Sequence, residues 1–464
     1  MDQLISVLDR IDGYVWGPVL IGLLLGTGIF LAIRMGFPQV RRFFHATALI
    51  SGRYDDPQDE GSLTHFQALS AALSATIGTG NIAGVATAIA AGGPGAVFWM
   101  WLTGLFGMGI KYTECMLGFH YRVLHQDGSA SGGPMYYLER GLRQKGLGVL
   151  FAGFAVIASF GIGNMVQANS VAKPIADNLS FPAWATGLVL AILVGLVIIG
   201  GIRRIGRVAA KIVPFMCVIY VLGALIILIS HADKILAAFS LIFGSAFSGT
   251  AATGGFLGAG VKQAIQLGVA RGIFSNESGL GSAPIAHAAA KTKEPVREGL
   301  VAMVGPLIDT LLICTMTALV IICTGQWNSG LTSSPLSARA FSVGLAGYGG
   351  WIVVFGLVFF AFSTMISWSY YGDRCAAYLF GEKAVVPYRW VFVLVIPLGA
   401  YLKIDLVWKL SDIFNGLMAF PNLIGIIGLS PIVYRLSKNY FAREQKAVQK
   451  KTTIFRQFWK MTGE

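Results

Sequence analysis

Apolar stretches of 18 or more residues recur along most of this chain and restrict the folds that it can adopt. A helix of about 20 apolar residues crosses the roughly 30 Å hydrocarbon core of a bilayer. Of the 464 residues, 55% are hydrophobic and only 12% are charged, whereas a soluble domain carries about 25% charged residues. A core cannot hide so much apolar surface, so lipid must cover part of it. The sequence therefore predicts an all-α polytopic membrane protein.

Eleven transmembrane segments are predicted from these stretches. They are 15–34, 66–91, 95–120, 149–172, 183–201, 212–230, 262–290, 299–324, 350–378, 389–403 and 410–434. Basic residues favour the cytoplasmic side. If the N-terminus lies outside, 25 of the 35 Lys and Arg residues fall in the predicted cytoplasmic segments. Those segments are 34–64, 121–148, 202–211, 291–298, 379–389 and 435–464. The asymmetry predicts an extracellular N-terminus and a cytoplasmic C-terminus.

The ten segments after the first divide into two groups of five, 66–230 and 262–434. Their lead helices are predicted to cross in opposite directions, which makes an inverted repeat, an arrangement common in secondary transporters. The remaining parts are an N-terminal helix with the first cytoplasmic loop (1–65), an extracellular connector (231–261) and a basic cytoplasmic tail (435–464). The net charge of +13 needs no nucleic-acid partner, because a basic tail can rest near anionic membrane lipid.

Each lead segment contains glycines and polar residues where a membrane helix should be uniformly apolar. The first reads GTGNIAG (78–84) and the second reads GIFSNESGLGS (272–282). Unwound backbone inside a membrane is tolerated only where protein or a water-lined cavity surrounds it. Free helix N-termini favour an anionic group and released carbonyls favour a cation. The paired interruptions therefore predict a mid-membrane site for a small zwitterion together with Na⁺.

Two other interpretations apply to the first stretch. Gly80 and Gly84 form a GxxxG pattern, which can serve only to pack helices closely. Packing does not explain Asn276 and Glu277 at membrane depth in the second stretch. A glycine-rich nucleotide loop would require a preceding strand in a βαβ unit, and no such unit is predicted here.

Longer motifs at these positions resemble one known family. GGPGAVFWMWLTGLFG (92–107), SASGGPMYYLERGL (129–142), GIFSNESGLGSAPIAHAAA (272–290) and FSTMISWSYYGDR (362–374) are similar to the sodium:alanine symporters, also called alanine or glycine:cation symporters. The resemblance covers essentially the whole chain. It implies a leucine-transporter-type fold in a bacterial or archaeal cytoplasmic membrane, and uptake of alanine or glycine by Na⁺ symport through alternating access. It implies no enzyme activity, no organic cofactor and no obligatory protein partner.

The same resemblance assigns roles to individual residues. Substrate is expected at the amides of Thr79 and Gly80, with Phe274 covering it and Ser275 and Asn276 beside it. One Na⁺ is expected at the carbonyl of Thr76 and the side chain of Asn81, with Ser275 as a further ligand. A second Na⁺ is expected at four residues, the carbonyls of Ser74 and Ile77 and the hydroxyls of Ser363 and Thr364. Hydroxyl and carbonyl oxygens suit hard cations such as Na⁺.

Two further residues are predicted to shape the substrate pocket. Gln167 lies in the middle of a span and is expected to hydrogen-bond the substrate's carboxylate or ammonium group, since polar residues inside spans often mark function. The alternative for Gln167 is a bond between helices. Trp368 is expected to close the pocket around a methyl-sized side chain, and plain packing is its alternative.

Charged residues inside the spans carry predictions of their own. Lys111 and Glu114 are three residues apart and are expected to pair, with a relay as the alternative. Glu277 is expected to bind the ion, to bond freed amides or to meet Arg271. Asp309 and the pair Asp373–Arg374 are assigned to networks between helices or at a cytoplasmic gate, and His287 to structure or to proton coupling.

Two kinds of functional alternative remain: transporters of the same fold with another ion or substrate, and proteins of another class. An H⁺-coupled carrier, or one that accepts serine, would retain the fold. A membrane enzyme would need converging catalytic groups, and the sequence shows neither a GxSxG elbow nor an HExxH motif. A channel fits poorly with two central interruptions in one chain. The loop 129–146 is expected to hold an amphipathic helix from Met135 to Leu142, as an exit guard or as a connector.

Overall fold

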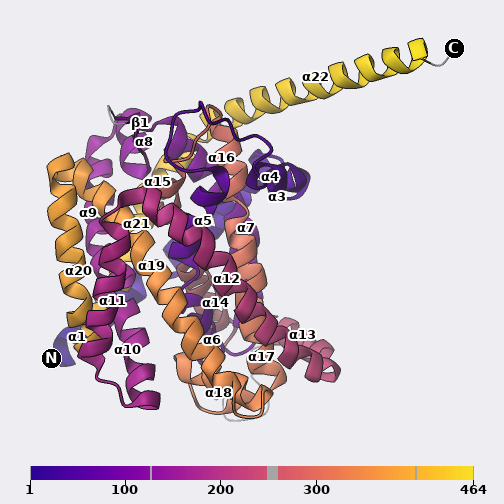
Figure 1. The fold of residues 1–464 in the computed structure, drawn as a ribbon. Helices are drawn as coiled ribbons and strands as arrows, with labels where there is room; N and C mark the ends of the chain where they lie inside the picture. Colours follow the sequence, from indigo (N-terminus) through magenta and orange to yellow (C-terminus); the bar gives the residue numbers. More distant parts are fainter. Residues whose placement is uncertain (1, 126–127, 248–259, 403–404, 463–464) are drawn as a thin grey trace.

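The chain folds into a helical bundle with one short hairpin (Figure 1). The structure is a computed structural model that describes residues 2–125, 128–247, 260–402 and 405–462. Its α-helices are α1 Asp2–Val15, α2 Pro18–Arg34, α3 Pro38–Arg41, α4 Phe43–Ile50, α5 His65–Thr76, α6 Val85–Gly92, α7 Ala96–His120, α8 Pro134–Arg140, α9 Lys145–Phe160, α10 Val166–Leu179, α11 Ala183–Ile198, α12 Gly201–Ser230, α13 Ala232–Phe247, α14 Val261–Asn276, α15 Ala283–His287, α16 Pro295–Ala302, α17 Thr315–Cys323, α18 Ser333–Gly344, α19 Gly349–Phe380, α20 Val385–Tyr401, α21 Asp405–Gly428 and α22 Ser430–Thr462.

Shorter elements link these helices. The π-helical turns are η1 Gly80–Gly84, η2 Gly161–Met165 and η3 Leu307–Cys314, and the 3-10 turns are η4 Gln326–Asn328 and η5 Glu382–Ala384. Strand β1 Val123–Leu124 pairs antiparallel with β2 Ala130–Ser131. Helix α8 follows this hairpin, which confirms the helix predicted in the loop 129–146, and α8 packs against α9.

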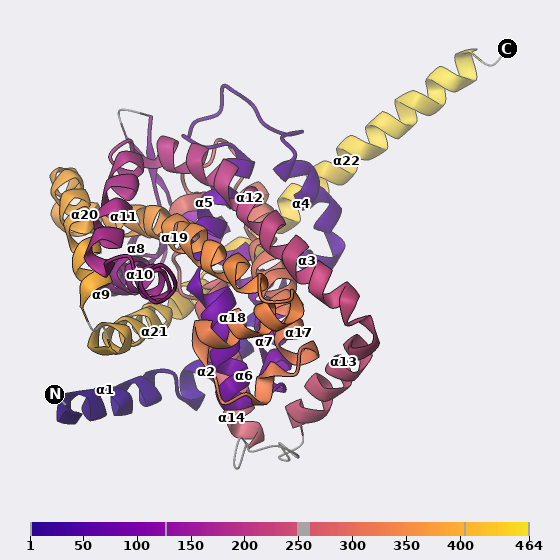
Figure 2. The same ribbon diagram turned by 60° about the horizontal axis from the view of Figure 1, so that its bottom comes forward.

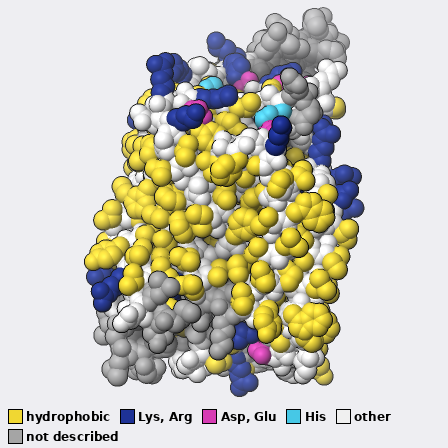
Figure 3. Space-filling view, turned by 90° about the vertical axis from the view of Figure 1, so that its left-hand side faces the viewer, with side chains coloured by type: hydrophobic (Ala, Val, Ile, Leu, Met, Phe, Trp, Pro, Cys, Tyr) yellow, Lys and Arg dark blue, Asp and Glu magenta, His cyan; other side chains and the backbone are white. Residues whose placement is uncertain are grey.

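The outer surface of the bundle is apolar, as expected for a protein in lipid. Figure 3 shows hydrophobic side chains over the middle of one face, with Lys and Arg towards its ends. Among the described residues, seven helices are long and apolar enough to cross a membrane, or eight if the bent pair His65–Thr76 and Gly80–Gly92 is one span. The molecule is therefore a multi-pass membrane protein.

The segments predicted to share one side of the membrane lie at one end of the molecule. Figure 1 places α4, β1, α8 and α16 at the top, where α22 also leaves the bundle, and α6, α13 and α18 towards the bottom. The basic segments are thus gathered at the end from which the C-terminal helix extends.

Several predicted boundaries differ from the structure. The loop predicted at 202–211 is part of the continuous helix α12, because its four basic residues do not interrupt helical backbone. The connector predicted at 231–261 begins with α13, and its residues 248–259 lie outside the described residues. The last span ends at Gly428 rather than at 434, since α22 already begins at Ser430.

The glycine-rich motif at 92–107 lets α7 lie at the centre of the bundle, in contact with α2, α14 and α16. A methyl group at Gly95 would lie 2.4 Å from the carbonyl oxygen of Ser245, and one at Gly107 would lie 2.6 Å from Ser278 Oγ. A side chain at either position would collide with these neighbouring atoms, so both positions require glycine. Helices α6 and α14, which follow and precede the two interruptions, lie side by side (Figure 2).

Candidate functional site

The first predicted interruption is present and is three residues long. Helix α5 begins with a capping box between Thr64 and Gln67 and ends at Thr76. Ile77 is then extended, with φ −76° and ψ 91°, and the chain resumes in the π-helical turn η1. The two helical parts are bent by 51° relative to each other. Residues 77–79 are hereafter the first break.

Asn81 stabilises the first break from within. Its Oδ1 accepts a hydrogen bond from the amide of Gly78 at 2.9 Å, which satisfies a donor that the bend removes from the helix. The first amides after such a bend lack partners within the new helix. Thr79 and Gly80 occupy those positions, so the predicted carboxylate-binding amides lie at the start of a helix.

Close approaches explain the two glycines. A methyl group at Gly78 would lie 2.7 Å from Thr364 Oγ1, and one at Gly80 would lie 3.2 Å from Phe274 Cδ1 and 3.3 Å from Ser275 Cα. The first break therefore lies against α19 on one side and against α14 on the other.

The second predicted interruption is also present and is longer. Helix α14 ends at Asn276, Glu277 has the left-handed backbone (φ 54°) and α15 starts at Ala283. Gly279 and Gly281 have φ of 89° and 81°, a conformation that glycine adopts without strain. Residues 277–282 are hereafter the second break.

Side chains from other helices hold the second break in place. Trp368 Nε1 donates a hydrogen bond to Glu277 Oε1 at 2.9 Å, and Ser282 Oγ donates to Glu277 Oε2. Asn422 Nδ2 donates to the carbonyl of Gly279 at 2.8 Å. Of the three predicted contacts of Glu277, the one with Arg271 is wrong: Arg271 instead lies 3.5 Å from Asp412.

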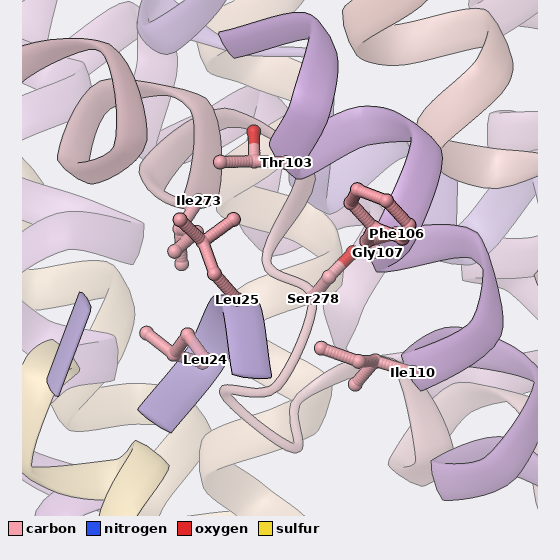
Figure 4. A pocket seen from close by; sticks show the side chains of 8 residues that line it. All are labelled: Leu24, Leu25, Thr103, Phe106, Gly107, Ile110, Ile273 and Ser278. Atoms are coloured by element: carbon pink, nitrogen blue, oxygen red, sulfur yellow. The ribbon is translucent and has the colours of Figure 1, made fainter. Parts of the chain in front are cut away.

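Ser278 in the second break faces a small cavity beside α7 and α2. Figure 4 shows its hydroxyl near Gly107, with Thr103, Ile110 and Leu24 also around the space. The cavity measures about 10 Å³ and is mostly apolar. None of the described residues that line this cavity is charged, so we assign it to the wall of the site and not to a separate polar binding site.

Asp309 connects the two lead helices, and its place beside the breaks was missed by sequence reasoning. Asn81 Nδ2 donates to Asp309 Oδ1 at 2.6 Å, Ser275 Oγ donates to Oδ2 at 3.0 Å and Thr310 Oγ1 donates to Oδ2 at 2.7 Å. The prediction of an interhelical network is confirmed. A lone acid in an apolar span gave no sign of these partners, which are distant in sequence.

The residues predicted for the second Na⁺ converge where α5 meets α19. Ser74 Oγ donates to the carbonyl of Ser363 at 2.7 Å and lies 2.7 Å from Ser367 Oγ. Ser363 Oγ turns back to its own helix and donates to Phe360 at 2.9 Å. Thr364 Oγ1 is buried and has no hydrogen-bond partner among the described residues.

Gln167 of α10 reaches the first break. Its Nε2 donates to the carbonyl of Ile162 at 2.9 Å and to Thr79 Oγ1 at 3.4 Å. Its Oε1 would lie 3.8 Å from a methyl group at Gly78. This oxygen is likewise buried without a partner in the part of the chain that the structure describes.

Other predicted site residues have defined partners. Thr76 Oγ1 donates to the carbonyl of Leu73 at 3.2 Å. Asn276 Nδ2 donates to Thr310 at 3.1 Å, so its amide faces the wall behind the break. Phe274 lies between Gly80 and the ring of Trp408, with ring centroids 6.4 Å apart.

Five other charged residues within the spans contact one another away from the first break. Lys111 Nζ lies 3.6 Å from Glu114 Oε1, so the predicted pair is confirmed. Asp373 binds Arg374 at 2.8 Å and also Arg389, on the end of the molecule that holds α8. The five charges thus belong to the framework around the site.

Comparison with solved structures defines the class of protein. The chain aligns with "MhsT in complex with L-phenylalanine" at a TM-score of 0.55 and 13% identity, which covers 82% of this chain and 98% of that one. The chain therefore has the fold of the leucine-transporter-type proteins. At this identity, the similarity concerns the fold alone.

Comparison of sequences identifies the family. The model of the sodium:alanine symporter family matches residues 1–455. The sodium/alanine symporter AgcS of Methanococcus maripaludis is 50% identical over 444 residues, which cover 94% of this chain and 97% of that protein. An uncharacterized transporter of Haemophilus influenzae is 49% identical over 94% of this chain and 96% of its own length. The chain belongs to the sodium:alanine symporter family and is a transporter rather than an enzyme.

Proposed function

We propose that this chain imports alanine and glycine together with Na⁺ by alternating access, and that both ligands bind at the first break. Membership of the family supports a Na⁺-coupled amino acid transporter. The observation that carries the proposal is the pair of buried oxygens beside Gly78. Gln167 Oε1 and Thr364 Oγ1 have no partner among the described residues, and a buried polar group without a partner is costly unless a ligand satisfies it.

The substrate carboxylate is assigned to the amides of Thr79 and Gly80, where the helix dipole favours negative charge. Gln167 lies within reach of the same end of the break. Phe274 and Ser275 approach Gly80 from α14 and limit the size of the bound amino acid. The close approach of neighbouring atoms to Gly78 and Gly80 supports a small substrate such as alanine or glycine over larger amino acids.

One Na⁺ is assigned next to the substrate, with the carbonyl of Thr76, the side chain of Asn81 and Ser275 as ligands. The carboxylate of Asp309, bonded to both Asn81 and Ser275, supplies the negative charge that a buried cation needs. The second Na⁺ is assigned to Ser74, Ile77, Ser363 and Thr364. The free hydroxyl of Thr364 fits this role better than that of Ser363, which is bonded within its own helix.

The proposed topology has eleven crossings, an inverted five-plus-five repeat, an outer N-terminus and a cytoplasmic C-terminus. The gathering of basic segments at the end from which α22 extends supports it, since basic segments stay in the cytoplasm. The tail near that end is placed against anionic lipid.

Uptake of labelled alanine into liposomes that contain the purified full chain tests the function. We expect an inward Na⁺ gradient to drive accumulation at clamped membrane potential, and a protonophore to leave it unchanged. Equal uptake after replacement of Na⁺ by K⁺, or uptake driven by a proton gradient alone, would contradict the proposal.

A further inference from the structure

Three buried side chains form a cluster that the transport site does not use. Glu298 of α16 lies between His65 of α5 and His287 of α15, and all three are at most 1% exposed. His287 Nδ1 lies 2.7 Å from Glu298 Oε2, and His65 Nδ1 is hydrogen-bonded to Glu298 Oε1. One carboxylate thus has an imidazole on each oxygen.

The charge balance of this cluster depends on one proton. A buried carboxylate is costly unless an opposite charge compensates it. With both imidazoles neutral, the cluster carries one negative charge. When one imidazole is protonated, the charge of Glu298 is neutralised at hydrogen-bond distance. The geometry therefore favours binding of one proton within the cluster.

The cluster lies where the ends of the two lead helices are joined. The amides of Ser62 and Leu63, just before α5, donate to the carbonyl of Ala289, just after α15, at 2.8 and 3.1 Å. The amide of Lys291 returns a bond to Leu63 at 2.7 Å. His65 and His287 extend this junction into the protein, so parting the two helix ends separates at least one imidazole from Glu298.

Arg122 strengthens the same junction from the end of α7. Its guanidinium donates to the carbonyls of Ala288 and Ala290 at 3.0 and 2.7 Å, and to that of Glu60 at 3.1 Å. This side chain therefore binds the segments on both sides of the junction. The cluster and Arg122 together hold the start of α5 and the end of α15 against each other.

The cluster connects the protein surface with the interior. His65 Nε2 lies 4.0 Å from Asp55 Oδ1, whose side chain is one-third exposed, and this nitrogen has no other bond within the described residues. On the inner side, His287 lines a cavity of about 10 Å³ together with Lys111 and Asn276, which is room for about one water molecule. Protons thus have a short route to the cluster from the Asp55 end.

Other charged and titratable groups face the cluster from the elements packed around it. They are Asp55 before α5, Lys111 and Cys115 on α7, Arg122 after α7, and Arg297 on α16. The positive members favour ionised Glu298 and oppose a second proton, and Asp55 favours a protonated His65. Among the described residues, no group of His, Cys, Asp and Glu is arranged to hold a metal ion.

We propose that His65, Glu298 and His287 form a proton-binding latch that holds the lead helices together at the Asp55 end. The latch rests on the proposed function in one respect, that this end opens during transport. Because an imidazole beside Glu298 holds a proton more tightly than one parted from it, protons favour the closed latch. Opening at this end therefore becomes easier as the pH on the Asp55 side rises.

Exchange of labelled alanine in liposomes with the pH set separately on each side tests the latch. Lowering the pH from 8 to 6 on the Asp55 side should slow exchange in the unmodified chain, by up to about tenfold per pH unit for one linked proton. E298Q should lose this dependence, and H65Q and H287Q should each weaken it, because one imidazole remains beside Glu298. The compartment that Asp55 faces is found by labelling D56C, an exposed neighbour, with a membrane-impermeant maleimide.

His120→Gln is the matched control. His120 is exposed at the end of α7, and its ring contacts that of Tyr121, with centroids 4.8 Å apart. This variant should keep the pH profile of the unmodified chain. A profile in E298Q, or in both H65Q and H287Q, that matches the unmodified chain would overturn the proposal, and so would loss of the profile in H120Q alone.

Nuclear magnetic resonance of the full chain with ¹³C-labelled histidine measures protonation of the imidazoles independently of transport. H65Q and H287Q assign the two imidazoles among the six histidines of the chain. We expect their titrations to be coupled and to become independent in E298Q, with Na⁺-dependent alanine binding retained as proof of folding. Independent titrations in the unmodified chain would overturn the latch. Absence of Na⁺-driven alanine uptake at every pH would instead contradict the proposed function.

Discussion

The two breaks differ in how their polar groups are satisfied. The first break spans three residues, and beside it Gln167 Oε1 and Thr364 Oγ1 have no partner among the described residues. The second break spans six residues, and Trp368 and Asn422 donate to Glu277 and Gly279 within it. Interrupting a helix in a membrane requires new partners for the backbone. The hydroxyl of Ser278 in the second break is also buried without a partner among the described residues, but it faces a small, mostly apolar cavity. We infer that protein side chains hold the second break and that cargo binds beside the first.

Gly281→Ala should have the largest effect, on folding rather than on binding alone. The added methyl group would lie 2.5 Å from Pro134 Cγ, at a backbone φ of 81°. Strain and overpacking of this kind cost about 1–3 kcal/mol each, so the thermal unfolding temperature should fall clearly. Gly84→Ala is the control, because a methyl group there meets nothing within 4 Å. Equal unfolding temperatures in the two variants would contradict the structural role of the second break.

Asp309→Asn should weaken Na⁺-dependent alanine binding with the fold retained. The amide would place a donor against Asn81 or Ser275, which now donate to the carboxylate, and would remove the negative charge near the proposed ion. We expect the binding free energy of Na⁺ to weaken by about 1–3 kcal/mol, which is a loss of about 5- to 150-fold in Na⁺ affinity. Calorimetric titration of Na⁺ at fixed alanine measures it. Unchanged Na⁺ affinity would exclude Asp309 from the ion site.

Thr364→Val and Ser363→Ala separate the two hydroxyls at the second proposed ion site. Valine removes the free oxygen of Thr364 beside Gly78 and should lower the apparent Na⁺ affinity about tenfold, the factor for about 1.4 kcal/mol. Ser363→Ala should change it little, because Ser363 Oγ is bonded to Phe360 in its own helix. Transport rates measured against Na⁺ concentration distinguish the two. The opposite order of effects would place the ion at Ser363.

Trp368→Leu should have the smallest effect on alanine itself and should broaden specificity. Trp368 packs on Gly163, where a methyl group would lie 2.4 Å from the Trp368 Cβ, and it donates to Glu277. A smaller side chain would leave space near both breaks and weaken the second one. Leucine and methionine should then compete with labelled alanine about fivefold more strongly or better, since a methylene in a pocket changes binding by about 1–3 kcal/mol. Unchanged competition would leave Trp368 a packing residue only.

The sequence predicted both breaks because glycine and amide residues stand out against apolar segments. The first interruption was expected near Gly78–Asn81 and lies at 77–79, and the second was expected near Phe274–Gly279 and lies at 277–282, because Phe274 to Asn276 still belong to α14. The pair Lys111–Glu114 was also predictable, because helical spacing alone brings the two side chains together. Local features of this kind are visible in a single stretch of sequence.

Contacts between distant segments were not predictable in the same way. Asp309 lies 228 residues from Asn81 along the chain, and Glu298 lies 233 residues from His65. Each acid stands alone in its own segment, and only the folded arrangement shows what surrounds it. For the same reason, none of the three alternatives given for Glu277, the ion site, freed amides or Arg271, named Trp368 of α19, which donates to it in the structure.

The most direct test of binding at the first break measures how close the bound amino acid lies to the backbone amides there. Solid-state nuclear magnetic resonance can measure dipolar coupling between the carboxyl carbon of ¹³C-labelled alanine and the ¹⁵N-labelled amides of Thr79 and Gly80. We expect strong coupling in the presence of Na⁺, since a hydrogen bond brings amide nitrogen and carboxylate oxygen to about 3 Å. Alanine bound with Na⁺ but uncoupled to either amide would contradict the assignment of the first break as the binding site.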